Sequence, residues 1–64
     1  MVNVEVIQEK ASAQGLTFAA IERRADIANG SIARWKDSSP NLQTIQKVAH
    51  VLGCTVDELI VKED

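Results

Sequence analysis

The sequence predicts one all-α domain, residues 1–64, built from five short helices. Apolar residues recur at helical spacing in several stretches, each bounded by capping or turn residues. No stretch of useful length alternates as a β-strand would. Phe18 and Trp35 are the only aromatic residues, so Ile, Leu, Val and Ala must fill the core. A domain of this size buries roughly 60% of the surface of its unfolded chain, which favours short, closely packed helices.

The first two predicted helices are separated by a glycine turn. The first covers residues 3–14 and ends at Gly15, which can adopt the left-handed conformation of a helix C-cap. Thr17 is the expected N-cap of the second helix. Leu16 precedes it and is placed to pack against Ile21 as a hydrophobic staple.

The second and third helices are predicted to meet at an angle. One apolar stripe ends near residue 25, and a second stripe resumes out of phase. The stripe members are Phe18, Ile21 and Ala25, then Ile27, Ile32 and Trp35. Because both stripes must reach one core, the chain has to turn at residues 26–28. The pattern therefore predicts a helix-turn-helix over about residues 17–36, with its second helix at residues 29–36.

The last two helices follow a loop at residues 37–40. Asn41 is the expected cap of the fourth helix, which ends at Gly53, and Thr55 opens a short fifth helix. Residues 61–64 are expected to fray. The residues predicted to face the core are Leu42, Ile45, Val48, Ala49 and Leu52, then Val56, Leu59 and Ile60.

The outer face of the third helix combines small polar residues with cations. Its residues are Asn29, Gly30, Ser31 and Arg34, with Lys36 just beyond. Short hydrogen-bonding groups at a helix start, followed by an arginine one turn later, suit a helix that enters the DNA major groove end-first. Double-stranded DNA is therefore the predicted partner.

Net charge and its distribution point in different directions. The chain carries a formal charge of −2, so it has no general cationic field for phosphate. Residues 22–36 nevertheless hold four cations and two acids, whereas residues 57–64 hold four acids and one lysine. The expected DNA affinity is modest and strongly salt dependent.

Several motifs occur together: Leu16-Thr17, Ile21, Ile32 with Trp35, Pro40 with Leu42, and the C-terminal motif Leu-Gly-Cys-Thr-Val-Asp-Glu-Leu at residues 52–59. Together they resemble the lambda-repressor/Cro-type helix-turn-helix family over residues 7–60. The resemblance implies a five-helix transcriptional regulator of phages, plasmids or bacteria, and a homodimer on a palindromic operator. We expect the dimer interface at the fifth helix and tail, where Val56, Ile60 and Val61 leave apolar surface.

Carried over by position, the resemblance places the base-reading residues at Asn29, Gly30, Ser31 and Arg34. Asn29 is expected to bond the edge of adenine, and Arg34 a guanine or a phosphate. Phe18 stands where the family has a polar phosphate contact, so its ring is expected to touch a sugar or a thymine methyl group.

Two departures from the family concern the turn. Asp26 replaces the usual glycine and must therefore adopt the left-handed conformation. Ala28 replaces the usual capping residue, which is expected to cost about 1 kcal/mol at the start of the third helix.

Some of these residues have a second interpretation. Asn29-Gly30 is also a strong hairpin signal, although no strand pattern flanks it. Arg23 and Arg24 are either phosphate contacts or the solvated side of their helix. Ser38 is either simple loop polarity or a group whose N–H and hydroxyl approach a phosphate.

No catalytic residue, metal site or cofactor is predicted. Cys54 is the single cysteine, so it forms no internal disulfide and no Cys-rich zinc site, and we expect it to pack as a small apolar group. His50 has no second His or suitable Cys one turn away and is expected at the surface. No nucleophile–His spacing or phosphate-binding glycine loop indicates an enzyme. No apolar run approaches the ~20 residues of a membrane span, and the lone cysteine suits a reducing cytoplasm.

Two functions remain open at this point. The first is a sequence-specific DNA-binding regulator, which the motif and the local cations favour. The alternative is a protein-interaction module of the same fold, such as an antitoxin-like or antirepressor subunit, which the acidic net charge favours.

Overall fold

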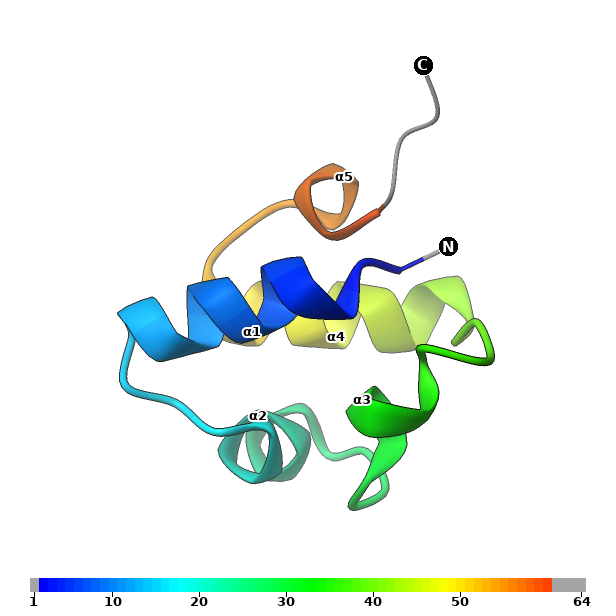
Figure 1. The fold of residues 1–64 in the computed structure, drawn as a ribbon, viewed down its shortest axis with the longest axis horizontal. Coiled ribbons are helices and arrows are strands. Elements are labelled where there is room, and N and C mark those ends of the chain that lie inside the picture. Colours follow the sequence, from blue (N-terminus) through cyan, green and yellow to red (C-terminus); the bar gives the residue numbers. More distant parts are fainter. Residues whose placement is uncertain (1, 61–64) are drawn as a thin grey trace.

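Helix α4 (Leu42–Leu52) is the longest of the described helices. The computed structural model describes residues 2–60, and within that range it contains five helices and no extended sheet, which confirms the predicted all-α fold. The other helices are α1 (Val4–Ala13), α2 (Phe18–Ala25), α3 (Ser31–Arg34) and α5 (Val56–Leu59). Helix α2 packs chiefly on α4. Figure 1 shows α2 and α3 on one side of α4 and α5 on the opposite side.

The core draws residues from all of these helices. Its members are Val2, Val4, Ile7, Ala11, Ile21, Ala25, Ile32, Trp35, Ile45, Val48, Ala49, Leu52 and Leu59. The predicted core position of Trp35 is therefore confirmed. The prediction for Leu42 is wrong, because 58% of this residue is exposed. Helical periodicity identifies the face on which a residue lies, but it does not say whether a neighbouring element covers that part of the face.

Local caps explain where the longer helices begin and end. The side chains of Asn3, Thr17 and Asn41 accept backbone N–H bonds at the starts of α1, α2 and α4. Helix α1 is slightly shorter than residues 3–14, because Asn3 and Gln14 are its caps and lie outside it. Gly15, at φ 70°, adopts the left-handed conformation that the sequence required of it.

The two ends of the described chain meet beside α5. The Asn3 N–H donates to the Leu59 carbonyl at 2.7 Å, and Val2 pairs with Ile60 in an isolated antiparallel bridge. Leu59 is fully buried as predicted, whereas Val56 and Ile60 are only half-buried. The predicted fraying at residues 61–64 concerns a segment outside the described residues. None of the helices within residues 2–60 is long and apolar enough to cross a membrane.

Candidate nucleic-acid interface

The chain reverses direction at Asp26, immediately after α2. Asp26 has φ 58° and ψ 47°, which is the left-handed conformation expected when aspartate replaces a turn glycine. Its N–H donates to the Arg23 carbonyl at 3.3 Å, and the Ile27 N–H donates to the Glu22 carbonyl at 3.0 Å. Aspartate is among the non-glycine residues that tolerate this conformation. The turn therefore forms without glycine and directs the chain from α2 toward α3.

Helix α3 is shorter than the predicted span of residues 29–36. Asn29 and Gly30 form a turn before it, and Trp35 is its C-cap. Gly30 has φ 85°, a left-handed conformation that cannot belong to a right-handed helix, so the helix starts one residue later. The hairpin alternative is also wrong, because no strands flank this turn in the part of the chain that is described.

A buried carboxylate takes the place of an N-cap side chain at the start of α3. Glu22 is only 3% exposed and is the one charged residue in the buried set of residues 2–60. Its Oε1 accepts from the Gly30 N–H and its Oε2 accepts from the Ile32 N–H, both at 3.0 Å. The prediction that Ala28 occupies the cap position is therefore wrong, since Gly30 is the N-cap of α3 and Glu22 bonds the N–H groups of Gly30 and Ile32.

The sequence patterns did not predict a role for Glu22. A signal was available, because Glu22 lies four positions after Phe18 and three before Ala25, on the apolar side of α2. A charged residue within an apolar stripe requires a buried partner. The two backbone donors are those partners, but they follow eight and ten positions later in the chain.

Most of the predicted contact residues lie on the surface of the motif. The exposed residues are Arg23, Asn29, Gly30, Arg34, Lys36 and Ser38, and the half-buried ones are Phe18 and Ser31. Arg23 and Asn29 line the same hollow of about 330 Å³, together with Ala19, Glu22 and Ile27. The structure thus brings a cation of α2 and a polar residue of the turn to one depression in the surface.

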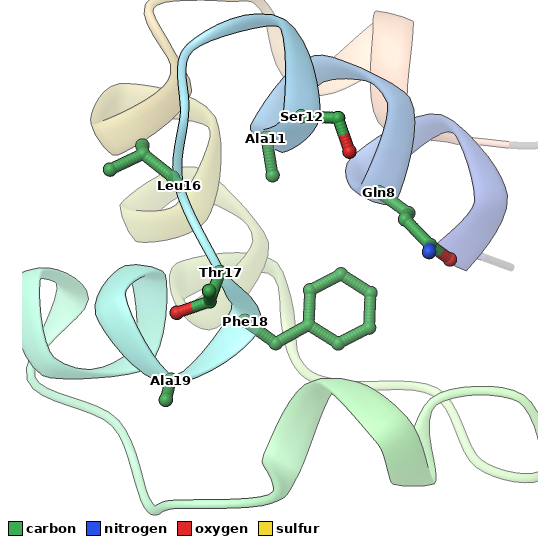
Figure 2. Close-up of a pocket in the computed structure, with 7 residues that line it drawn as sticks. All are labelled: Gln8, Ala11, Ser12, Leu16, Thr17, Phe18 and Ala19. Carbon is green, nitrogen blue, oxygen red and sulfur yellow. The ribbon is translucent and has the colours of Figure 1, made fainter.

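Phe18 lies at a different depression. It lines a hollow of about 450 Å³ between α1 and α2 with Gln8, Ser12 and Thr17, among others. Figure 2 shows the ring projecting from the start of α2, on the same side as Gln8 and Ser12, whereas Leu16 points the other way. The ring is partly packed against the core. Phe18 and Asn29 therefore line separate hollows, although Ala19 borders both.

The hydroxyl groups of two predicted contact residues are engaged within the motif. Ser31 Oγ donates to the Ala28 carbonyl at 2.6 Å. Ser38 donates both its N–H and its hydroxyl to the Arg34 carbonyl, each at 3.1 Å. In this conformation both residues hold the ends of α3, and their oxygen lone pairs remain available to accept bonds.

Cys54 and His50 occupy the environments expected of them. Cys54 is half-buried against the core, and burial raises the pKa of its thiol, an effect that the charge of Lys10 partly opposes. A thiol with a raised pKa remains neutral and packs as a small apolar group, as predicted. His50 is exposed. No group of three or more potential metal ligands lies together within residues 2–60.

Comparison with known proteins identifies the motif. A family profile of the Cro/C1-type HTH DNA-binding domain matches residues 6–64. A comparison with curated proteins gave no match, and neither did a comparison with solved structures. The matched range includes the turn at Asp26, the buried Glu22 and all the exposed residues of the motif.

Proposed function

The chain belongs to the Cro/C1-type helix-turn-helix DNA-binding family, and we propose that it is a sequence-specific transcriptional repressor of the phage, plasmid or bacterial type. In this proposal it acts in the cytoplasm, with α3 and the turn before it in the major groove and α2 across the phosphate backbone. The observation that carries the proposal is the exposed Asn29-Gly30 turn, followed by exposed Arg34 and anchored to the core by Glu22.

The base contacts are proposed to come from the turn and from α3. The Asn29 amide can pair with the edge of adenine, and the Arg34 guanidinium can bind guanine through two parallel bonds. Gly30 carries no side chain, and the space where a Cβ would stand is empty, so a base or phosphate can approach its backbone. Ser31 would contribute its oxygen as an acceptor, since its hydroxyl hydrogen is directed to Ala28.

Other residues of the motif are proposed to contact the sugars and phosphates of the DNA backbone. Arg23 and Lys36 are exposed cations that precede and follow the Asn29-Gly30 turn in the sequence, and they are assigned to phosphates. The Phe18 ring is assigned to a sugar or a thymine methyl group. Ser38 is assigned to a phosphate next to the C-terminal end of α3, where its bonds to the Arg34 carbonyl would have to rearrange for it to donate.

We place two copies of the chain on a palindromic operator. One α3 contacts only a few base pairs, so a homodimer with its reading helices about 34 Å apart would read adjacent major grooves on one DNA face. Helix α5 is the proposed interface, because Val56 and Ile60 remain half-buried there. Val61, the third residue expected at this interface, lies outside the described residues. Native mass measured with and without DNA tests the dimer, and a single-chain mass in both would contradict it.

Selection of bound sequences from a random duplex pool tests the function as a whole. At about 100 mM salt, nonspecific phosphate attraction is partly screened. We expect recovery of an inverted repeat whose half-sites are about one helical turn apart. Absence of any enriched sequence would contradict the proposal and favour the protein-interaction module.

A further inference from the structure

We infer that Glu22 is a positioning residue that determines how sharply the domain distinguishes its own DNA site from other sequences. The inference rests on the proposed function, because it concerns the accuracy of base reading. Glu22 itself is buried and is not expected to contact DNA. It acts through the two backbone N–H groups that its carboxylate holds at the start of α3.

The carboxylate is well suited to hold this segment. A buried charge costs several kcal/mol unless it is hydrogen-bonded or paired. Both Glu22 oxygens are bonded to backbone N–H groups, and the structure shows no ion pair to this carboxylate within residues 2–60. Bonds to a charged acceptor are stronger than neutral ones. The burial of Glu22 is therefore compensated only while Gly30 and Ile32 stay in place.

The two bonds also fix an orientation. They span three consecutive residues, Gly30 to Ile32, so the rigid plane of the carboxylate sets both the position and the tilt of this segment. Helix α3 contains only four residues, about one turn, and cannot maintain its own direction. Asn29 lies directly before the held segment and Arg34 two residues after it. Loosening the segment would displace both proposed base-reading side chains.

If only the charge of Glu22 mattered, its replacement by glutamine would strengthen DNA binding, whereas a positioning role predicts weaker binding to the selected site. Loss of a negative charge close to the DNA should by itself strengthen binding to every phosphate backbone. A glutamine amide, however, has one oxygen, and its NH₂ group would face a backbone donor. If Glu22 positions the reading segment, Glu22→Gln must weaken binding to the selected site and leave binding to random DNA equal or stronger.

The experiment compares wild type, Glu22→Gln and the matched control Glu9→Gln on the selected site and on random duplex at one salt concentration. Glu9 is exposed on α1, so the control makes the same charge change away from the core. We expect Glu22→Gln to reduce the ratio of site affinity to random-DNA affinity by about tenfold or more. The control should keep this ratio within about twofold. An unchanged ratio for folded Glu22→Gln would overturn the inference.

A measurement without DNA separates this inference from the proposed function. In the wild-type protein, the amide hydrogens of Gly30 and Ile32 should exchange more slowly with solvent than that of exposed Asn29. Glu22→Gln should accelerate these two amides and leave those in the middle of α4 protected. If the variant does not fold, hydrogen exchange of the wild-type protein still tests the inference. Gly30 and Ile32 amides that exchange as fast as the Asn29 amide would overturn it. Absence of any selected DNA site would contradict the function alone.

Discussion

Helices α4 and α3 are held in place by different means. Helix α4 has eleven residues, a side-chain cap from Asn41, a left-handed C-cap at Gly53 and four buried residues along one face. Helix α3 has four residues and no cap from its own N-cap residue, and it begins where Glu22 bonds its backbone. Signals close in sequence therefore define α4, whereas a distant side chain defines the start of α3.

Because of this difference, we expect substitutions in α4 to affect stability and substitutions in the turn and α3 to affect DNA binding. The buried face of α4 supports α2 and α5, so changes there should act on the free energy of unfolding. The turn and α3 expose Asn29, Gly30 and Arg34, so changes there should act on DNA binding. Unfolding measurements and DNA-binding measurements should therefore respond to different substitutions.

The largest effect is expected from a pair of leucines in α4. Leu52 is 4% exposed and Leu42 is 58% exposed, so the same substitution removes core packing at one end of the helix only. Leu52→Ala should lower the free energy of unfolding by ~2–5 kcal/mol, and Leu42→Ala should change it by no more than about 0.5 kcal/mol. Urea denaturation followed by circular dichroism measures both. Equal losses would show that Leu42 is covered in solution.

The next effect concerns binding and not folding. Arg34→Ala should weaken binding to the selected operator by ~1–3 kcal/mol, because it removes a base contact, and should leave the urea midpoint unchanged since the side chain is exposed. Arg23→Ala, assigned to phosphate, should weaken binding to the operator and to random duplex alike. Fluorescence anisotropy on both DNAs distinguishes these cases. An equal loss on both DNAs for Arg34→Ala would reject its role as a base reader.

A smaller effect contrasts the caps of the two helices. Asn41 Oδ1 accepts the Thr44 N–H at 2.8 Å, so Asn41→Ala should cost about 1 kcal/mol of stability. Ala28→Ser should have almost no effect, because Ala28 is not the N-cap of α3 and Glu22 already bonds the Ile32 N–H in the first turn of that helix. Thermal unfolding of both variants is the measurement. A stabilisation of about 1 kcal/mol by Ala28→Ser would mean that Glu22 does not supply the cap.

The smallest effect is a pH dependence at α5. The Thr55 N–H and the nearby Lys10 charge lower the pKa of Glu58. The bond from the Thr55 N–H is 2.8 Å long, and Lys10 Nζ lies 3.8 Å from the carboxylate. Because the folded-state pKa is lowered, this stabilisation is complete above the ordinary glutamate pKa of about 4.3. It is lost as the pH falls through the lower folded-state pKa.

Glu58→Gln should therefore be less stable than wild type at neutral pH, and the difference should shrink as the solution is acidified. Urea denaturation at a series of pH values measures this difference. Asp57→Asn is the matched control, because it removes the same charge from the same helix without touching the Thr55 bond. A Glu58→Gln difference that stays constant with pH would contradict the assignment.

Much of the fold followed from patterns within one helix. Thr17 and Asn41 cap their helices, Trp35 lies in the core, and Asp26 adopts the left-handed conformation, all as the sequence predicted. Each prediction depended on residues within a few positions of one another. The predicted α3 began too early because Gly30 was counted as helical, although glycine readily adopts the left-handed conformation it has here.

The order of the helices, most of the core and the polar character of the Asn29-Gly30 turn follow from local patterns in the chain, because helical periodicity and capping act over one or two turns. The packing of the helices on one another leaves Leu42 exposed and brings the Glu22 carboxylate to the start of α3. Burial depends on which element covers a face, and the Glu22 bonds join residues eight and ten positions apart. Such contacts exist only after α2 and α3 have packed on the shared core, so no local pattern specifies them.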